Sequence, residues 1–249
     1  MDNFLKTIRD KARRGEPTGG FEAGNRYNEE FDYFDFHAAR FSFLFDLGRR
    51  YFTSGAKFLD IGSLFGYVCL GYQALGYQVF GTDLEKYVAS FAPQFKKWQI
   101  DNRASDLGSG PIPYPDQAFD LVMASEVLEH FRFHPLIFFK EAARVLKSDG
   151  RLIITTPNLI RLNNVIKMIL GRSINWDIND EYWDGAHARE FTAAELTAIA
   201  AQSGLLPEKT IYHNFSYPNL SAVVRIVNQI SGWLFPRRRG NLVIIFKKL

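Results

Sequence analysis

Short apolar runs alternate with longer amphipathic segments from Lys57 to about Gly204. The runs predict buried strands, and apolar positions three and four residues apart predict helices between them. The predicted strands are Lys57–Ile61, Gln78–Thr82, Gln99–Arg103, Phe119–Ala124 and Arg151–Thr155. The predicted helices are Tyr67–Leu75, Leu84–Lys97, Pro135–Leu146 and Ala193–Gln202. This repeated order of strand and helix indicates a doubly wound α/β fold, with a mostly parallel sheet covered on both faces.

The two ends of the chain have a different pattern. Before Lys57 the sequence predicts a short amphipathic helix, a loop and an aromatic helix, over Met1–Arg14, Gly15–Asn28 and Glu29–Phe52. The aromatic segment has too many apolar positions for a solvated helix, so it should be mostly buried. Toward the C-terminus the sequence predicts two strands around an apolar helical stretch, at Lys209–Asn214, Asn241–Lys248 and Ser221–Phe235.

Composition narrows the class of protein. The chain has 249 residues, a formal net charge of +3 and one cysteine, Cys69. A net charge this small does not by itself indicate nucleic-acid binding. A single cysteine excludes an internal disulfide and a Cys-rich zinc site. The first residues lack the apolar core of a signal peptide, and no apolar run reaches the length of about 18 residues that a membrane span needs. We therefore expect a cytoplasmic protein.

The clearest chemical signal follows the first predicted strand, where Asp60 precedes a turn containing Gly62 and Gly66. A strand that enters a helix through such a turn presents backbone N–H groups and the positive helix end to a ligand. The glycine spacing is not the one that nicotinamide dinucleotides require, which argues against an oxidoreductase of the same fold. A carboxylate at this strand tip would repel a pyrophosphate but suits an ammonium or sulfonium group.

Acidic residues follow the next strands as well. Asp83 stands about 20 residues after Gly62, where a carboxylate can bind both hydroxyls of a ribose; it could also cap the following helix. Asp106 follows the third strand and could accept a hydrogen bond from an adenine amino group, or be a plain loop residue. Glu126 and His130 follow the fourth strand, so they should face the cleft at the carboxyl end of the sheet.

Taken in order, these segments resemble the class I S-adenosylmethionine-dependent methyltransferases. The resemblance rests on Leu-Asp-Ile-Gly, Gly-Thr-Asp, Tyr-Pro-Asp-x-x-Phe-Asp-Leu-Val, Glu-Val-Leu-Glu-His and Glu-Ala-Ala-Arg-Val-Leu-Lys-x-x-Gly-Arg-Leu-Ile-Ile-Thr-Thr-Pro-Asn, between Lys57 and Gly204. The set is most similar to a small bacterial branch that includes ubiquinone and sugar methyltransferases. In one departure, Leu64 stands where the family has its middle glycine.

The resemblance implies a seven-stranded sheet whose last strand is antiparallel, in one domain over 1–249. We expect an N-terminal helical extension over 1–55, a cofactor-binding core over 56–215, and a helical insertion with the last strand over 216–249. The cofactor would be S-adenosylmethionine, and S-adenosylhomocysteine the product. The resemblance implies that Asp60, Gly62 and Gly66 hold the methionine part of the cofactor, Asp83 the ribose and Asp106 the adenine amino group. Further cofactor-binding residues are expected at Ser63, Leu84, Leu107 and Glu126. No metal ligand is expected.

A hydroxyl acceptor benefits from a general base, and histidine suits that task at neutral pH. His130 and His187 are the candidates, with Glu126 as a carboxylate alternative, although each histidine could be an ordinary loop residue. Thr192 and Glu195 predict a capping box just after His187. His37 and Arg40 could close the cofactor pocket or bind an acidic acceptor, but a place on the helix surface is the favoured interpretation.

The segment before His187 suggests the class of acceptor. Amides, acids and aromatic rings suit a polyhydroxylated acceptor such as a sugar or glycan; they are Asn163, Asn164, Arg172, Asn175, Trp176, Asp177, Tyr182 and Trp183. The segment also fits an ordinary surface excursion. The apolar stretch Ser221–Phe235 and the arginines up to Arg239 could instead contact a membrane surface at 221–239, where a lipid-linked or quinone-type acceptor would lie.

Three functions follow from these patterns. The first is O-methylation of a small hydroxylated acceptor, with polysaccharide biosynthesis as its setting. The second is methylation of a lipid-linked or quinone-type acceptor at a membrane. The third is cofactor binding without catalysis, because Leu64 interrupts the glycine motif. Nucleic acid is not expected as a partner, since no stripe of Lys and Arg crosses the acceptor segment, and the oligomeric state stays open.

Overall fold

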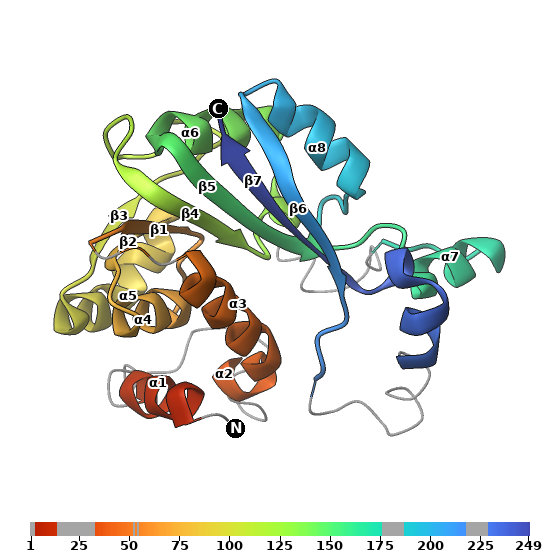
Figure 1. Cartoon of the computed structure of the whole chain (residues 1–249), viewed down its shortest axis with the longest axis horizontal. Helices are drawn as coiled ribbons and strands as arrows, with labels where there is room; N and C mark the ends of the chain where they lie inside the picture. The colour runs from red at the N-terminus through yellow and green to blue at the C-terminus, as the bar shows by residue number, and fades with distance from the viewer. Residues whose placement is uncertain (1–2, 14–32, 52, 54, 176–186, 218–228) are drawn as a thin grey trace.

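Seven strands of the described part of the chain form one sheet, in the order β3-β2-β1-β4-β5-β7-β6 (Figure 1). The computed structural model describes residues 3–13, 33–51, 53, 55–175, 187–217 and 229–249. The strands are β1 Lys57–Ile61, β2 Gln78–Asp83, β3 Asp101–Ala104, β4 Phe119–Ser125, β5 Leu146–Pro157, β6 Leu205–His213 and β7 Asn241–Lys248. Strands β1 to β5 pair in parallel, and β7 is antiparallel to its neighbours β5 and β6. The expected doubly wound fold with an antiparallel last strand is confirmed.

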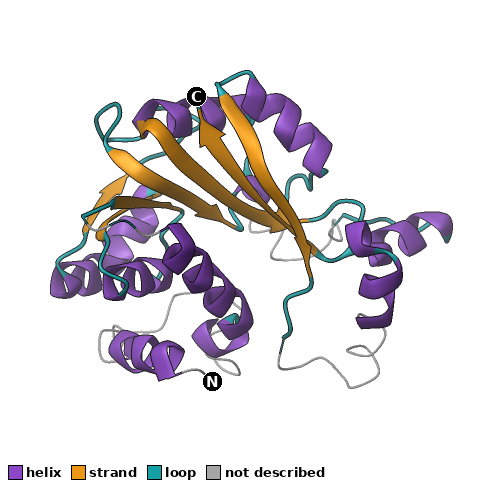
Figure 2. Cartoon of the chain, viewed as in Figure 1, coloured by secondary structure: helices purple, strands orange, loops and turns teal. Residues whose placement is uncertain are grey.

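Helices cover both faces of this sheet (Figure 2). They are α1 Asn3–Arg13, α2 Tyr33–Phe36, α3 Ala38–Tyr51, α4 Tyr67–Ala74, α5 Glu85–Trp98, η1 Leu128–His130, α6 Leu136–Val145, α7 Leu162–Ile169, α8 Ala193–Ala201 and η3 Pro236–Arg238. Successive strand residues point to opposite faces. Phe58 of β1 therefore packs in one cluster with α1, α3, α4 and α5, while its neighbour Leu59 packs in another with α6 and α8.

Several element boundaries differ from those predicted. Gln99 adopts a left-handed conformation, with φ +57°, that ends α5, so β3 begins at Asp101 rather than two residues earlier. Strand β5 begins at Leu146, which the sequence assigned to the preceding helix, because Leu146 pairs with Phe119 at the edge of β4. Strand β6 begins at Leu205 for a similar reason, since the residue pairs with Lys248 of β7. Pairing between strands, which a local sequence pattern does not contain, decided the starts of β5 and β6.

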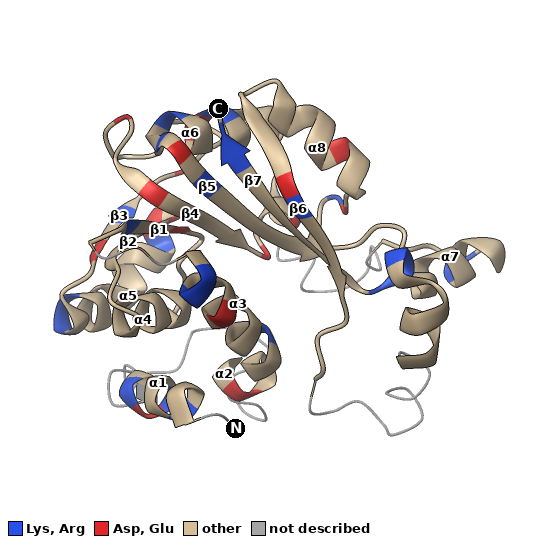
Figure 3. Ribbon diagram, viewed as in Figure 1, with Lys and Arg blue, Asp and Glu red and all other residues tan. Residues whose placement is uncertain are grey.

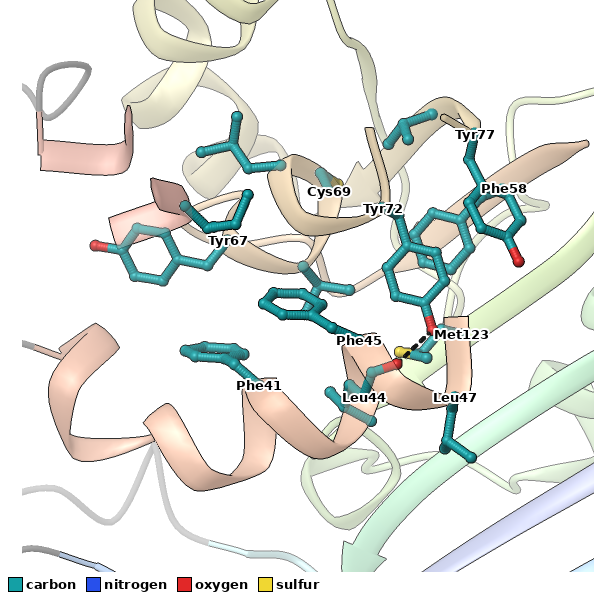
Figure 4. Close-up of a cluster of buried hydrophobic side chains, with 14 of the residues drawn as sticks. Phe41, Leu44, Phe45, Leu47, Phe58, Tyr67, Cys69, Tyr72, Tyr77 and Met123 are labelled. Atoms are coloured by element: carbon teal, nitrogen blue, oxygen red, sulfur yellow. Dashed lines mark hydrogen bonds between the residues drawn. The ribbon is translucent and has the colours of Figure 1, made fainter. Parts of the chain in front are cut away.

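The aromatic N-terminal segment is buried, as expected, but it is not one helix. It divides at His37 into α2 and α3. Phe34, Phe41 and Phe45 are buried, and they pack against α4. Figure 4 shows the cluster, in which the Tyr72 hydroxyl donates to the Leu44 carbonyl at 2.9 Å.

The remaining predictions at the two ends are met in part. Helix α1 confirms the amphipathic segment at the N-terminus. The predicted loop at Gly15–Asn28 and most of the apolar stretch at Ser221–Phe235 lie outside the described residues, though residues 229–234 are helical. None of the helices in the described part has the length and apolar content to cross a bilayer.

Candidate functional site

The turn between β1 and α4 has the backbone geometry of a ligand-binding loop. Gly62 and Gly66 have φ values of +78° and +73°, a region that costs glycine little and other residues roughly 1–2 kcal/mol. Leu64 also lies at positive φ, +40°, in the place where the glycine motif is interrupted. Its backbone N–H donates to Oδ2 of Asp83 at 2.7 Å. The carboxylate at the tip of β2 therefore accepts a hydrogen bond from the turn at Leu64, the residue that interrupts the glycine motif.

The glycines also satisfy packing. A Cβ on Gly62 would lie 2.5 Å from Cγ2 of Val127, and one on Gly66 would lie 2.7 Å from the Trp98 ring. Gly62 therefore brings β1 close to the loop after β4. Gly66 brings the start of α4 against α5. The two glycines are therefore required by the packing of neighbouring segments as well as by the conformation of the turn.

Asp83 lies at the tip of β2, and its carboxylate is mostly committed to backbone. Oδ1 accepts from the N–H of Leu84 and Oδ2 from that of Leu64, both at 2.7 Å. The N-cap of α5 is Leu84, so the alternative role of Asp83 as the cap is wrong. Burial raises the pKa of Asp83, and the two N–H donors oppose that shift. The carboxylate stays at the edge of the turn, where further hydroxyl donors can approach it.

Asp60 is buried at the floor of the cleft, with 2% of its surface exposed. Burial raises the pKa of this carboxyl to about 8, while a hydrogen bond from the Cys69 thiol at 3.5 Å acts in the opposite direction. A buried carboxyl of this kind is costly when ionised and unpaired, and a ligand cation beside it would restore the ionised form.

The raised pKa of Asp60 leads to a prediction about stability and pH. In the unfolded chain this group ionises near pH 4, whereas the folded protein keeps its proton up to about pH 8. The folded state thus binds more protons between these values, and the stability of the ligand-free protein should fall as pH rises through that window. Asp60→Asn should flatten the dependence. Urea unfolding at a series of pH values measures it, and an unchanged slope in Asp60→Asn would assign the effect to another group.

A cleft of about 80 Å³ lies at the carboxyl ends of β1 and β4. It brings together Asp60, Gly62, Ser63 and Glu126, as the sequence predicted. Gly66, Asp83, Leu84, Asp106 and Leu107 lie outside its lining. Asp106 is exposed and accepts from the N–H of Gly108 at 2.9 Å, in a local turn.

The N-terminal helices form one wall of this cleft. Tyr33, Arg40 and Phe41 line it opposite the glycine turn. Arg40 is buried, donates to the Tyr33 hydroxyl at 3.2 Å and lies 3.8 Å from Oε2 of Glu126. His37 is also buried, and burial together with Arg40 lowers its pKa to about 2. The favoured interpretation of His37 and Arg40 as helix-surface residues was wrong, because Arg40 lines the cleft and the His37 ring packs against Tyr33 and Tyr217.

Glu126 connects the cleft to a second cluster of polar side chains. It has φ +57°, and its Oε1 accepts from the Thr155 hydroxyl at 2.8 Å. Three positions along, Glu129 is fully buried, and its Oε2 accepts from the Thr156 hydroxyl at 3.0 Å. Burial raises the pKa of Glu129 well above its usual range, and the nearby charge of Glu126 adds to the shift. The protonated form is therefore favoured in the free protein.

The two candidate histidines lie together at this cluster. The rings of His130 and His187 are 5.1 Å apart at their centres, and nearly perpendicular. One ligand atom each from Glu129, His130 and His187 lies within 4.8 Å of the others, so the three could hold a divalent cation. This possibility departs from the expectation of no metal ligand.

Glu190 holds His187 from the other side. Its Oε1 lies 3.5 Å from Nδ1 of His187, and Oε2 accepts from Arg161 and from Asn164. Burial alone would raise the pKa of Glu190, but His187, Arg161 and Asn164 outweigh it and lower that pKa to about 2. Glu190 is therefore ionised at neutral pH. A pocket of about 180 Å³ lies beside it, lined by Leu159, Ile174, Asn175, His187, Ala188, Arg189 and Glu190.

The sequence analysis did not identify Glu129 and Glu190 as members of the histidine cluster. Glu129 directly precedes His130, and Glu190 lies three residues after His187. An acidic residue so near a candidate histidine was the feature of the sequence from which both could have been predicted. The predicted capping box of Thr192 and Glu195 is confirmed, with both reciprocal hydrogen bonds present. Asn164, predicted to face an acceptor, is instead buried and ties the Leu159 carbonyl to Glu190. Trp176, Asp177, Tyr182 and Trp183 lie outside the described residues.

Comparisons with known proteins agree with this geometry. Residues 59–154 match the methyltransferase domain family. A probable S-adenosylmethionine-dependent methyltransferase of Mycolicibacterium smegmatis is 30% identical over 126 residues, which are 50% of this chain and 43% of the relative. The chain thus spans less than half the length of this curated relative.

Solved structures share the fold. An S-adenosylmethionine-dependent methyltransferase from Mesorhizobium loti has a TM-score of 0.57 at 20% identity, covering 82% of this chain and 96% of that one. A magnesium protoporphyrin IX methyltransferase from Synechocystis, with bound S-adenosylhomocysteine, has a TM-score of 0.58 at 17% identity, covering 100% and 97%. The fold and the ordered strand-tip motifs agree with the family match over residues 59–154. Over residues 59–154 the chain is thus similar to methyltransferase domains, and the curated relative that it matches is a probable S-adenosylmethionine-dependent methyltransferase.

Proposed function

We propose that this chain transfers the methyl group of S-adenosylmethionine to a hydroxyl of a small polar acceptor, a sugar or glycan intermediate being the best fit. The observation that supports the proposal most directly is the pair His130 and His187, with Glu190 ionised behind His187 and a pocket in front of it. The polar lining, with Asn175 and Arg189, suits an acceptor that carries hydroxyl groups.

The cleft fits the cofactor in its chemistry. The buried carboxyl of Asp60 suits the methionine ammonium, and the glycine turn offers backbone N–H groups. Asp83, at the tip of β2 and outside the lining of the cleft, is our candidate for the ribose hydroxyls. Asp106 and Leu107 do not line the cleft, so an adenine bound by them would lie outside it. A volume of about 80 Å³ is below the roughly 300–1,000 Å³ of typical ligand sites. We therefore expect the cleft to hold only part of the cofactor.

The proposed chemistry needs alignment and one proton acceptor. When bound, the cofactor supplies an electrophilic methyl carbon: the acceptor oxygen bonds to that carbon as the carbon–sulfur bond breaks, and the electron pair stays on sulfur in S-adenosylhomocysteine. His187 takes the hydroxyl proton at Nε2, because Glu190 faces Nδ1. Holding the two reacting centres in line supplies much of the acceleration in such displacements. Glu126, which spans the cleft and the histidine cluster, is the alternative proton acceptor.

The first test is binding, followed by transfer. Calorimetry should show binding of S-adenosylmethionine and S-adenosylhomocysteine but not of NAD. Transfer of a radiolabelled methyl group to a panel of sugars, nucleotide sugars, phenols and amines should then be confined to hydroxyl acceptors. Binding without transfer to any of them would favour a non-catalytic cofactor-binding protein, and transfer to amines alone would contradict the proposed acceptor class.

The assay is repeated after treatment with a chelator because Glu129, His130 and His187 could also hold a cation. Unchanged turnover is the result expected for a histidine acting as base. Loss of turnover that magnesium, manganese or zinc restores would replace the base with a metal-assisted mechanism.

Asp83→Ala should weaken cofactor binding by about 1–3 kcal/mol, the range for losing charge-assisted hydrogen bonds. The variant also removes the acceptor for the Leu64 N–H, so a loosened turn could give the same loss. A ligand control separates the two: S-adenosylhomocysteine without its ribose hydroxyls should bind wild type and variant equally. If the variant weakens both ligands to the same extent in calorimetry, Asp83 acts on the turn and not on the ribose.

A further inference from the structure

Large apolar side chains are exposed mainly at one end of the molecule. Of the twelve that are exposed in the described part of the chain, eight belong to two short segments. They are Ile166, Met168, Ile169 and Leu170 at α7, and Ile230, Trp233, Leu234 and Phe235 in and after the helix at 229–234. Ile169 and Trp233 are the most exposed, at 79% and 78%. Isolated exposed apolar residues need no explanation, but a concentration of this kind marks an interaction surface.

The two segments form one surface because they leave the sheet at the same point. Helix α7 follows β5 and the 229–234 helix precedes β7, and the ends of these strands pair at Pro157 and Asn241 (Figure 1). Asn158 donates to the carbonyls of Arg237 and Arg239 at 3.0 and 2.8 Å. Residues 159–175 and 229–240 are called the apolar tip below.

The charge of the apolar tip has one sign. Residues 159–175 and 229–240 contain no Asp or Glu, but they contain six basic residues: Arg161, Lys167, Arg172, Arg237, Arg238 and Arg239. In Figure 3 the ribbon of α7 and of η3 carries the blue of Lys and Arg and none of the red of Asp and Glu. Arg161 pairs with Glu190, and Arg239 donates to the carbonyls of Gly232 and Tyr212. Arg172, Arg237 and Arg238 remain exposed.

We propose that the apolar tip docks on the surface of an anionic lipid bilayer. Apolar side chains flanked by cations are the pattern of helices that lie in a membrane interface, with apolar groups in the acyl boundary and cations at acidic headgroups. A second copy of the chain fits less well, since a two-fold contact through this surface would set its cations against one another. The basic charge therefore selects lipid as the partner.

Docking would also orient the histidine cluster, a consequence that depends on the proposed function. Leu159, Ile174 and Asn175 line the pocket beside His187, and they flank α7 on either side in the sequence. A tip seated on the bilayer would bring that pocket toward the headgroup layer. An acceptor hydroxyl carried by a lipid would then have a short path to His187.

Flotation with vesicles tests the docking without using the cofactor, so its outcome does not depend on methyl transfer. The full chain is mixed with vesicles of phosphatidylcholine alone or with added phosphatidylglycerol, at low and high salt. We expect binding only to the anionic vesicles, weakened by salt because surface charges are screened. Reversing two charges with Arg237→Glu and Arg238→Glu should lower the partition coefficient by at least about tenfold, given about 1 kcal/mol for each basic residue near the surface.

A second pair of variants tests the apolar contribution. Ile169→Ser with Trp233→Ser should lose vesicle binding, while the control, Leu206→Ser with Leu249→Ser, replaces exposed apolar residues elsewhere and should bind as wild type. Quenching of tryptophan fluorescence by brominated lipid should disappear in Trp233→Phe. The proposal is overturned if wild type fails to float with anionic vesicles. It is also overturned if the Ser pair leaves flotation unchanged but converts a dimer to a monomer in analytical ultracentrifugation.

Discussion

Gly62→Val is expected to abolish binding of S-adenosylmethionine. The residue has φ +78°, and its Cβ would lie 2.5 Å from Cγ2 of Val127. A valine would therefore either displace the loop after β4 or change the backbone of the turn that faces the cofactor. Both changes move groups of the cleft, including Glu126, which directly precedes Val127. Calorimetry measures the loss, and circular dichroism confirms that the sheet is retained.

Gly204→Val is the matched control for backbone strain alone. Gly204 has nearly the same φ, +73°, but nothing lies within 4 Å of its added Cβ. This variant should cost roughly 1–2 kcal/mol of stability and leave cofactor affinity unchanged. A second control, Gly62→Ala combined with Val127→Ala, removes the closest contact and should recover part of the binding. Wild-type affinity in Gly62→Val would place the cofactor elsewhere.

His187→Ala should lower methyl transfer to a hydroxyl acceptor by about 10²–10⁴-fold with the cofactor dissociation constant unchanged. The reason is the loss of the base that Glu190 orients. Single-turnover rates with saturating cofactor measure the effect, because they separate the transfer step from binding and product release. His130→Ala is made in parallel, since its ring lies 5.1 Å away.

His134→Ala is the control for this series. It is an exposed histidine of the same loop whose Nδ1 accepts from the Leu136 N–H, and it has no place in the proposed chemistry. A large loss in His130→Ala alone would transfer the base role to that residue. If neither variant lowers the single-turnover rate, the histidine mechanism is wrong. A loss in Glu126→Gln would then identify the carboxylate as the base.

Local sequence patterns predicted most of the strands and helices of the fold and their order. The strand tips at Asp60, Asp83 and Glu126 could be placed because each follows a short apolar run, and parallel strands end at a common edge. Boundaries failed where pairing with another strand decided them, as at Leu146 and Leu205. A residue at a strand end pairs with a partner far along the chain, and no local period contains that information.

The candidate site, too, could be predicted from the sequence only in part. The sequence determined which side chains stand at the carboxyl edge of the sheet, because strand order and residue type are local properties. Only the tertiary structure brought His130 against His187, 57 positions apart in the numbering, and put Glu190 and Arg161 behind them. It also buried Arg40 at the cleft and His37 among aromatic rings, where the sequence favoured an exposed helix face. Packing decides these contacts, since burial and pairing depend on the summed fit of elements that are remote in sequence.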